Sequence, residues 1–591
     1  MNRSRTNPAR LPLLLAFALA ALAGCHTVSS VTPNPGSPGG TITIAGNGFG
    51  NTQATTSKVL YGGAELLVRS WSNTQIVADL PCNKPTGTYG VQVALNTDVS
   101  AAVNHNLVNN GSLQICNARV VQNANNKLSA YIQFDTTIAA APSVQVAGPD
   151  GTYMVPSGGI LSTNPGTTHK VGVLGMFTGG NYAFTAFATS GTTVSKGGLS
   201  YVPPQIPHVF PLVVNVSQPA EMEPGVTLFS LNNGLLNITP NNDGLYALDA
   251  QGRVVWYYRD GKYMLEVQRL ANGHILIMEY GGTMIYEIDV WGNILNTYLP
   301  ASIGVNLLHH DVITLPGGNY LTFSIEMRSI GGYPAGPTGC AGGVCNVVGD
   351  IITEFTPAGA LVSQIKMLDI LDPHRIPQME LFNTPLFNTL FGNIPTKDWS
   401  HCNGLQYSAG DDSLIVSCRS QDMVFKIRRS DSSMVWVLGS DDASSSGDDA
   451  WPFLTLTGPG MLQAYSHSPR LLANGNILLY DNGDYRPTEY TRLAEFAIDE
   501  PNLEVQQVWE WVDPDYVPPL YAYFSGGVEL EPGGTALQCD GGLLQTGNVN
   551  YVRLAEVNRT TFEKVFEVTI QNPSSAYISY RAQRVPTLYP P

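Results

Sequence analysis

Three histidines, His310, His401 and His467, each stand where an apolar stretch begins and runs on into a turn rich in Gly, Asn or Asp. An imidazole can act as nucleophile, acid, base or metal ligand, so histidines gathered at one point can transfer a charged group or hold a metal ion. Arg419 ends the second of these hairpins and offers a planar fork that suits a tetrahedral oxyanion. The available chemistry depends on which elements bring these residues together.

The histidines belong to a repeated β-unit. One half of the unit reads apolar strand, turn, apolar strand, as at 270–277, 315–323 and 472–480. The other half reads apolar, charged, apolar, turn, apolar, and its six copies lie at 246–256, 286–295, 353–365, 425–438, 496–511 and 555–568. Antiparallel strands with such turns, spaced about 40 to 70 residues apart, predict propeller blades. We therefore expect a six-bladed β-propeller over residues 220–591, because a β-sandwich would not repeat the same two turns six times.

Two histidines occupy matching places in their repeats. His310 precedes Asn319 by nine residues, and His467 precedes Asn476 by the same number. The innermost strands of a propeller line its central channel. If the histidine-bearing strands are the innermost ones, the imidazoles converge at one mouth of that channel.

Hairpin symmetry predicts two cross-strand neighbours. His401 mirrors Arg419 about Gly410, and counting across the turn that follows His467 places Asp481 opposite that histidine. A cluster of imidazoles beside a guanidinium favours transfer of an anionic group by a histidine nucleophile. Two alternatives remain open: histidines that only cap strands, and a zinc or copper site, which the Arg419 cation opposes.

Composition narrows the class of partner. The chain has 591 residues with 60 Gly and 40 Pro, and only 13% of its residues are charged, compared with the usual quarter. Its net charge of −16 argues against a nucleic-acid partner, because phosphate binding needs a basic face. An acidic protein that handles an anionic substrate needs a local positive pocket.

The N-terminus is predicted to be a processing signal over residues 1–25. Three arginines precede an apolar run at 11–22 that is too short to span a bilayer. The run ends in the sequence LAGC, which resembles a bacterial lipoprotein box and implies cleavage before Cys25 and lipidation of that cysteine. We therefore expect a protein of the bacterial cell envelope, held at the outer membrane by a lipid anchor alone and facing the periplasm or the cell surface. A plain secretory signal is the alternative.

Export permits disulfides. Of the eight cysteines, Cys402 and Cys418 are symmetric about the turn at Gly410 and are predicted to pair across the hairpin. Cys340 and Cys345 flank a Gly-rich loop that a disulfide could close. Cys82 and Cys116 form a weaker third pair, and Cys539 is left over. There are no Cys-x-x-Cys pairs, which argues against a structural zinc site.

Two further β-modules precede the propeller, so the expected fold class is all-β. Residues 28–110 resemble an IPT/TIG immunoglobulin-like domain, most clearly in the opening PGGTITIAGNGFG at 38–50. Such modules serve as spacers or adhesion elements. Residues 111–215 read as a second, β-sandwich-like domain without identifiable chemistry, and the Pro-rich stretch at 203–207 predicts a stiff linker.

Four ordered motifs resemble the bacterial arylsulfate sulfotransferases. They are LHHDV at 308–312, DWSHCN at 398–403, SCR at 417–419, and His467 followed by DNGDYR at 481–486. The resemblance covers the propeller and implies an exported six-bladed enzyme without metal or cofactor. It implies a ping-pong reaction that moves sulfate from a phenolic sulfate ester to a phenol acceptor through a sulfohistidine.

The resemblance also assigns roles to individual residues. His467 matches the family's nucleophile. His310 and His401 match the histidines that bind the sulfuryl group and its leaving oxygen, and Arg419 matches the arginine that neutralises the sulfate. The non-enzymatic alternative is a surface lipoprotein whose propeller binds glycans or protein partners.

Secondary positions follow from the same match. Asn403 and Ser525 are expected to contact substrate, whereas His309 is expected to be structural. Ser466 stands where the family's pattern leads us to expect glutamine, and the IPT/TIG-like module is additional.

Overall fold

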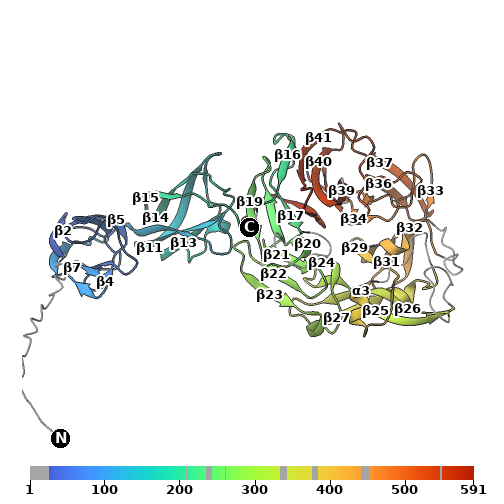
Figure 1. The fold of residues 1–591 in the computed structure, drawn as a ribbon, viewed down its shortest axis with the longest axis horizontal. Coiled ribbons are helices and arrows are strands. Elements are labelled where there is room, and N and C mark those ends of the chain that lie inside the picture. Colours follow the sequence, from blue (N-terminus) through green and yellow to red (C-terminus); the bar gives the residue numbers. More distant parts are fainter. Residues whose placement is uncertain are drawn as a thin grey trace, which may run out of the picture.

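Strands dominate the computed structural model and form three bodies arranged in a row (Figure 1). The structure describes residues 26–207, 209–233, 243–259, 261–332, 343–375, 384–440, 451–545 and 549–591. The predicted signal peptide with Cys25 lies outside these residues. Within the described part of the chain, no helix is long and apolar enough to cross a membrane.

The first body packs two small sheets around a core that includes Ile42, Ile44, Ile76 and Val93. One sheet has the order β1 (Thr27–Thr32), β2 (Thr41–Asn47), β6 (Gln75–Asp79) and β5 (Val68–Trp71). The other has β4 (Ala64–Glu65), β3 (Lys58–Tyr61), β7 (Gly87–Leu95) and β8 (Asp98–Val99), and β9 (Val103–Leu107) also pairs with β7. Alternating burial along β2 and β7 matches strands with one face in a core.

The second body is built on one long strand, β11 (Ala130–Gly148). Its first half pairs with β10 (Ile115–Gln122) and β13 (Gly166–Val173), and its second half with β12 (Gly151–Met154) and β14 (Tyr182–Ser190), which is followed by β15 (Thr192–Tyr201). The short 3-10 helix η1 (Ser157–Gly159) lies between β12 and β13.

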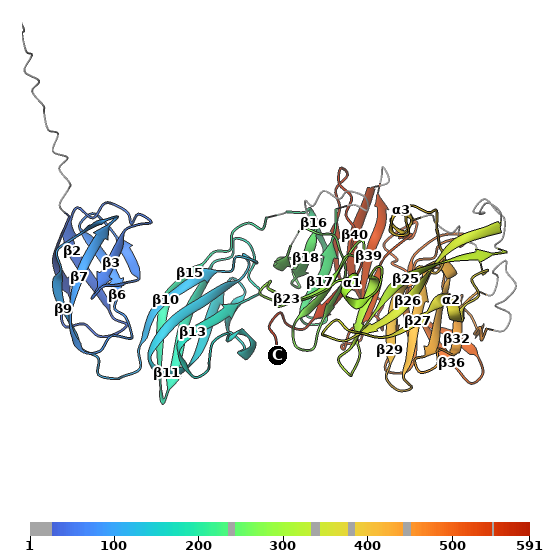
Figure 2. The same cartoon turned by 90° about the horizontal axis from the view of Figure 1, so that it is seen from below.

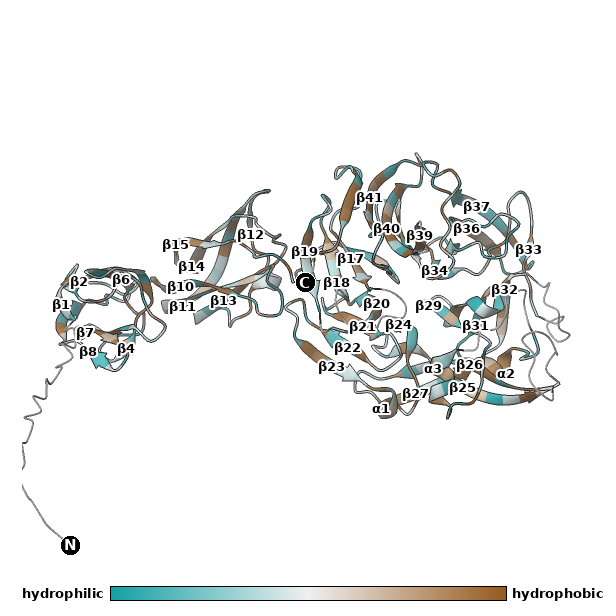
Figure 3. Ribbon diagram, viewed as in Figure 1, coloured by the Kyte–Doolittle hydropathy of each residue, from teal (hydrophilic) through white to brown (hydrophobic). Residues whose placement is uncertain are grey.

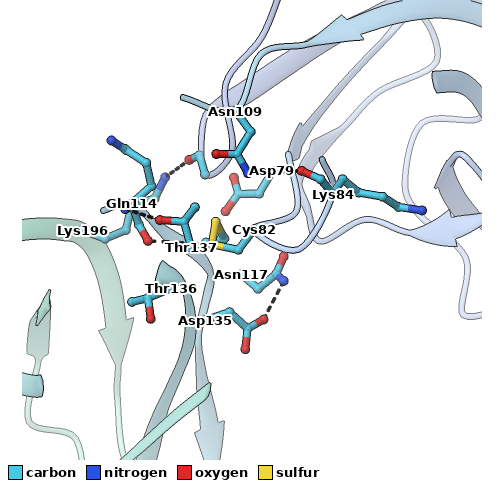
Figure 4. Close-up of a disulfide and its surroundings, with 12 residues drawn as sticks. Asp79, Cys82, Lys84, Asn109, Gln114, Asn117, Asp135, Thr136, Thr137 and Lys196 are labelled. Carbon is cyan, nitrogen blue, oxygen red and sulfur yellow. Dashed lines mark hydrogen bonds between the residues drawn. A yellow bond between two sulfur atoms is a disulfide. The ribbon is translucent and has the colours of Figure 1, made fainter. Parts of the chain in front are cut away.

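A disulfide joins the first two bodies. Cys82, just after β6, is bonded to Cys116 in β10, as predicted, with their Cα atoms 5.6 Å apart (Figure 4). Nearby, Arg69 Nη2 donates to the carbonyl of Ala118 at 2.8 Å, and Lys196 Nζ donates to the carbonyl of Gly39 at 3.3 Å. Covalent and polar contacts therefore hold this junction together.

The third body is a ring of six antiparallel sheets, which confirms the six-bladed propeller (Figure 1). From the innermost strand outwards, blade 1 is β42 (Ala582–Val585), β17 (Val226–Leu231), β18 (Gly244–Leu248) and β19 (Val254–Tyr258); blade 2 is β20 (Met264–Arg269), β21 (Ile275–Glu279), β22 (Ile285–Ile288) and β23 (Ile294–Tyr298); blade 3 is β24 (His309–Thr314), β25 (Tyr320–Gly331), β26 (Val344–Phe355) and β27 (Leu361–Lys366).

The remaining blades follow the same order. Blade 4 is β29 (Cys402–Ser408), β30 (Ser413–Cys418), β31 (Met423–Arg428) and β32 (Met434–Gly439); blade 5 is β34 (His467–Leu471), β35 (Ile477–Asp481), β36 (Arg492–Asp499) and β37 (Glu504–Trp511); blade 6 is β38 (Gly527–Leu530), β39 (Thr535–Gln545), β40 (Val549–Asn558) and β41 (Lys564–Ile570). Hydrophobic residues are spread along these strands (Figure 3), and they pack between neighbouring blades.

Both ends of the propeller sequence help to close the ring. The C-terminal β42 supplies the innermost strand of blade 1 by pairing with β17, and β16 (Leu212–Ser217) adds an outer strand to blade 6 by pairing with β41. Two short strands extend other blades: β28 (Lys397–Asp398) pairs with β26, and β33 (Thr455–Leu456) pairs with β37. Blade 1 is thus completed by a strand from the far end of the propeller sequence, which joins the first and last parts of the ring.

Short helices connect some of the propeller strands. They are α1 (Pro300–Ile303), α2 (Met367–Ile370), α3 (Pro385–Leu390) and the 3-10 helix η3 (Arg419–Gln421). Figure 2 shows α3 at the upper edge of the ring, and its Leu386 and Phe387 line the cavity described below.

The second body and the propeller share one core. Val146 and Phe184 belong to the same buried cluster as Trp256 and Trp291 of blades 1 and 2. Asn123 also donates from Nδ2 to the carbonyl of Trp291 at 3.0 Å. The second body is therefore packed onto the propeller as well as tethered to it by the 203–207 stretch.

Candidate active site

The histidine-bearing strands are the innermost ones. His310 lies in β24, His401 immediately precedes β29, and His467 opens β34. Strand β29 contacts both β24 and β34, the innermost strands of the neighbouring blades. The positional assumption made from the sequence is therefore met, and three blades present an imidazole to the same mouth of the channel.

A cavity of about 330 Å³ occupies this mouth. His310, His401, His467, Arg419 and Ser525 all line it. The structure thus brings together five of the six residues that the sequence singled out for chemistry or substrate contact.

Several of these residues have unusual backbone conformations, which set the direction of their side chains. His310, His401 and Ser525 have positive φ angles of 60°, 46° and 59°, a region that non-glycine residues rarely occupy. Each strain of this kind costs on the order of 1 kcal/mol or more and tends to occur at functional sites. A register shift next to His467 also corrects one prediction: His467 pairs with Tyr480, not with Asp481, because a bulge follows the histidine.

The protonation of His467 follows from its amide partner. Asn482 donates through Nδ2 to the carbonyls of Ala522 at 2.7 Å and Ser525 at 3.1 Å, so its Oδ1 must be the atom that faces His467 Nδ1 at 2.7 Å. An amide oxygen only accepts, so Nδ1 carries the proton and Nε2 is the unprotonated nitrogen. Burial, followed by the charge of Arg419, holds the pKa of His467 well below its ordinary value. His467 is therefore neutral at neutral pH.

His401 has a carboxylate partner instead. Its Nδ1 lies 2.7 Å from Oδ2 of Asp398. Burial acts to lower the pKa of His401, but the Asp398 carboxylate outweighs burial and the net pKa is raised. A positive charge on the His401 ring is therefore favoured by its carboxylate partner.

His310 has a histidine partner. Its Nδ1 lies 2.7 Å from Nδ1 of His309, and its ring meets that of His401 edge-on with centroids 4.8 Å apart. Burial, and after it the nearby imidazoles with His401 first, holds the pKa of His310 well below its ordinary value. A positive charge on the His310 ring is therefore disfavoured.

Arg419 is fixed by both backbone and side chain. Its N–H donates to the carbonyl of His401 at 3.0 Å, as the symmetry of the hairpin predicts. Its Nη2 donates to Asp484 Oδ2 at 2.8 Å and to the carbonyl of Tyr523 at 2.9 Å. Burial, partly offset by Arg419, raises the pKa of Asp484 to about 6. The guanidinium is thereby held at the cavity wall.

The predicted Cys402–Cys418 disulfide is present and joins residues that are directly opposite in the β29–β30 ladder. It ties together the segments that carry His401 and Arg419. Cys340 lies outside the described residues, so its pairing with the buried Cys345 stays a prediction. Cys539 is the free cysteine of the described part of the chain.

Comparison with known proteins agrees with this geometry. Residues 213–581 match the family model described as Arylsulfotransferase (ASST), and residues 27–110 match the IPT/TIG domain. The first match covers well over half of the chain. The chain belongs to the arylsulfotransferase family.

Two curated relatives carry the name arylsulfate sulfotransferase AssT. The protein from Escherichia coli O6:H1 is 24% identical over 429 residues, which are 59% of this chain and 68% of that one. The protein from Lelliottia amnigena is 24% identical over 348 residues, 47% of this chain and 56% of that one. A solved β-propeller domain, Cps50 (Swd1) of Myceliophteria thermophila, covers 56% of this chain and 81% of its own at 9% identity, and its TM-score of 0.29 is too low to support an argument.

The two residues expected to contact substrate differ in position within this arylsulfotransferase. Ser525 lines the cavity, with its Oγ donating to the carbonyl of Ser579 at 2.8 Å. Asn403 does not line the cavity. Its carbonyl accepts from Tyr580 Oη at 2.8 Å and Arg581 Nη2 at 2.7 Å, so Asn403 braces the residues around the site.

Sequence reasoning missed the partners of the histidines and the aromatic wall. Asp398, three residues before His401, and Asn482, within DNGDYR, were visible as parts of motifs but had no assigned role. The aromatic wall comprises Tyr263, Tyr280, Phe387, Tyr523, Phe524 and Tyr580, which come from separate loops and from α3. No periodic sequence signal links these rings. Their apolar surface suits a flat aryl group.

Proposed function

We propose that this arylsulfotransferase moves a sulfuryl group from a phenolic sulfate ester to a phenol by a ping-pong mechanism, with His467 as the nucleophile. One observation carries the proposal. The Oδ1 of Asn482 fixes the proton of a neutral His467 on Nδ1 and leaves Nε2 unprotonated, while burial and the charge of Arg419 disfavour the His467 cation. The same cavity contains Arg419 and also His401, whose pKa the Asp398 carboxylate raises. A neutral nucleophile beside fixed cations is the arrangement that attack on a sulfate ester requires.

In the donor half-reaction, His467 Nε2 forms a bond to sulfur while the bond from sulfur to the phenolic oxygen breaks. Arg419 and His401 stabilise the charge on the sulfuryl oxygens. The departing phenolate takes a proton from a neighbouring imidazole, which lowers the barrier because a phenol has a pKa of about 10. The products are a sulfohistidine and a free phenol.

In the acceptor half-reaction, a second phenol occupies the place of the first. Its oxygen forms a bond to sulfur, the bond from nitrogen to sulfur breaks, and its proton returns to the same imidazole. Positioning and charge stabilisation supply most of the rate enhancement, as in phosphoryl transfer.

We also propose that the enzyme works outside the cytosol as a lipid-anchored protein. The proposal rests on the LAGC sequence ending at Cys25 and agrees with the disulfides at Cys82–Cys116 and Cys402–Cys418. Mass analysis of the protein recovered from bacterial membranes tests it: the expected N-terminal residue is a diacylglyceryl-modified Cys25. An unmodified N-terminus at another position would contradict the anchor.

A chromogenic assay tests the activity. The purified protein is incubated with 4-nitrophenyl sulfate in the presence and absence of phenol. We expect nitrophenol release that depends on phenol, and, with donor alone, one sulfuryl group per chain on the peptide that contains His467. Steady release in water alone would indicate a sulfatase. No release with any donor would leave the non-enzymatic binding protein as the better description.

A further inference from the structure

His309, which has no role in the proposed reaction, connects His310 to the buried carboxylate of Asp350. His309 Nδ1 lies 2.7 Å from His310 Nδ1, and its Nε2 lies 2.9 Å from Oδ1 of Asp350. The ring of His309 is stacked on Phe323 with centroids 5.7 Å apart, which fixes its plane. Both histidines line the active-site cavity, and Asp350 is buried behind them.

Asp350 is held as a carboxylate. Its Oδ2 accepts from Ser400 Oγ and from the N–H of Cys402, both at 2.6 Å. Burial acts to raise the pKa of Asp350, but His309 and these two donors outweigh burial and the net pKa is lowered. The remaining oxygen, Oδ1, lies 2.9 Å from His309 Nε2, an ion-pair distance at which the ring N–H is not aligned for a hydrogen bond. Because a carboxylate favours a proton on the nitrogen that faces it, Nε2 is the nitrogen of His309 that carries the proton.

The position of this proton fixes the direction of the hydrogen bond between the two histidines. A neutral His309 that carries its proton on Nε2 can only accept at Nδ1. His310 must then donate from its own Nδ1, which leaves His310 Nε2 unprotonated. The cavity thus contains a second imidazole with a free lone pair, besides His467.

The partners distinguish three roles. His467 faces an amide, which cannot take up a proton. His401 faces a carboxylate directly, which favours its cation and resists loss of the proton in each cycle. His310 reaches a carboxylate through a second imidazole, so a proton can enter and leave without leaving a positive charge on His310 itself.

We propose that His310 is the acid–base residue of sulfuryl transfer and that His309 and Asp350 are positioning residues that relay and stabilise its proton. This inference rests on the proposed sulfotransferase function. In the acceptor half-reaction, the phenol O–H bond breaks as the bond from hydrogen to His310 Nε2 forms. The Nδ1 proton of His310 moves to His309 Nδ1, and the positive charge comes to lie on His309 beside Asp350. The donor half-reaction runs the same transfers in reverse toward the leaving phenolate.

The charge distribution supports this placement. A cation on His310 is disfavoured by burial and by neighbouring imidazoles. A cation on His309 instead lies 2.9 Å from a carboxylate oxygen. The relay thus keeps the cavity-facing ring neutral in both states, and only the side on which that ring carries its proton changes.

Asp350→Asn tests the relay with little change in shape. Ser400 Oγ and the Cys402 N–H both donate to one side of residue 350, so the amide oxygen should take that side and the amide nitrogen should face His309. The amide then donates to His309 Nε2, His309 donates to His310, and His310 Nε2 is locked as a donor. A wrong tautomer of this kind disables a base without removing it.

The measurement separates the two half-reactions. The sulfuryl-enzyme formed from 4-nitrophenyl sulfate is isolated and mixed with acceptors of graded acidity. For Asp350→Asn we expect transfer to unsubstituted phenol to fall at least about 100-fold, because general base catalysis is lost. The deficit should shrink steadily with more acidic phenols, which need less help from a base. Formation of the sulfuryl-enzyme should stay within about threefold of wild type, because nitrophenolate leaves without an acid.

Ser400→Ala is the matched control. It removes a hydroxyl that donates to Asp350 Oδ2 and accepts from the Asp350 N–H, but it keeps the carboxylate toward His309. Transfer to phenol should therefore stay within about threefold of wild type, and thermal unfolding measures the accompanying loss of stability. His309→Gln is the second relay variant, for use if Asp350→Asn folds poorly, and it should show the same dependence on acceptor acidity.

The outcomes are distinct. If wild type forms no sulfuryl-enzyme, the proposed function fails. If wild type forms it and the relay variants lose transfer equally with every acceptor, or lose none, His309 and Asp350 have only a structural role and the inference is wrong.

Discussion

Blades 4 and 5 place a histidine at equivalent positions but surround it with different partners. Each presents a histidine where its innermost strand begins, and each histidine places Nδ1 at 2.7 Å from an oxygen. In blade 4 that oxygen belongs to the Asp398 carboxylate, and the pKa of His401 is raised. In blade 5 it belongs to the Asn482 amide, and the pKa of His467 is lowered by burial and by Arg419.

The difference shows how a repeated fold supports a reaction that is not symmetric. The blade repeat sets where an imidazole lies, and the residues around the ring set the direction of its pKa shift: the Asp398 carboxylate raises the pKa of His401, whereas burial and Arg419 lower that of His467. Those partners do not come from matching places. Asp398 precedes His401 in β28, whereas Asn482 follows β35 across the hairpin from His467. The repeat therefore determines the position of each imidazole, and its local surroundings determine its protonation.

Removing the nucleophile should have the largest effect. His467→Asn keeps a polar side chain of similar bulk but cannot form the sulfohistidine. We expect turnover to fall by at least roughly 10⁴-fold and the sulfuryl label to disappear, as when other covalent nucleophiles are removed. Peptide mapping after incubation with donor alone provides the measurement. A label found on His310 or on a serine would assign the nucleophile elsewhere.

Arg419 lines the same cavity as the two histidines, and its charge acts to lower the pKa of both, although the net pKa of His401 is raised. Arg419→Lys retains a charge but loses the planar fork, so the sulfuryl oxygens lose a fixed donor. Transition-state stabilisation should weaken by about 3 kcal/mol, or roughly 10²-fold in turnover. Steady-state kinetics on protein with an unchanged melting temperature would measure this. Near-normal turnover would remove Arg419 from the reaction.

Asn482→Asp gives blade 5 the partner that blade 4 has. The new carboxylate should raise the pKa of His467, so that Nε2 is protonated and unable to attack at neutral pH. We expect turnover at pH 7 to fall roughly 10-fold, since a neighbouring charge shifts a pKa by about one to three units. Activity should recover as the pH rises through the raised pKa, and a pH–rate profile would show it.

The same substitution carries a structural cost that needs a control. Asn482 Nδ2 donates to the carbonyls of Ala522 and Ser525, and a carboxylate would leave both without that donor. A loss of stability of about 1–3 kcal/mol is expected. Thermal unfolding, with assays kept well below the transition, separates this loss from the change in protonation. A deficit that is constant across pH would contradict the comparison.

The positions of the cluster could be predicted in part from hairpin symmetry. The ladder from Gly404 to Ser408 is centred between Gly410 and Asp411, and a register shift between Cys402 and Gly404 brings Cys402 opposite Cys418. The symmetry about Gly410 thus predicted the disulfide and the Arg419–His401 contact correctly only because of this shift. The same count failed at His467, because a bulge before Arg470 shifts the partner from Asp481 to Tyr480. A bulge cannot be read from a single sequence, because it inserts one extra residue into a strand without requiring a particular residue type.

The partners were harder to predict than the positions. Asp350 lies in β26 and reaches His309 only because two strands of blade 3 and the segment before β29 meet in space. The aromatic wall likewise gathers rings from four separate loops and α3. Such contacts depend on tertiary packing, which periodicity and turn chemistry do not encode. The family resemblance supplied roles for the histidines, but the tautomers came from distances between named atoms.

The smallest expected effect concerns the cation of blade 4. Asp398→Asn gives His401 an amide partner like that of His467, so burial is no longer outweighed and the pKa of His401 should fall below its ordinary value. The ring is then neutral at pH 7 and stabilises the sulfuryl oxygens less well. Turnover should fall by only about 10-fold, because Arg419 remains to stabilise the same charge. The sign with pH is opposite to that of Asn482→Asp: activity should be best at low pH and decline as the pH rises through the lowered pKa. Rate profiles of both variants on one donor would measure this, and parallel profiles would mean that the two imidazoles do not differ in role.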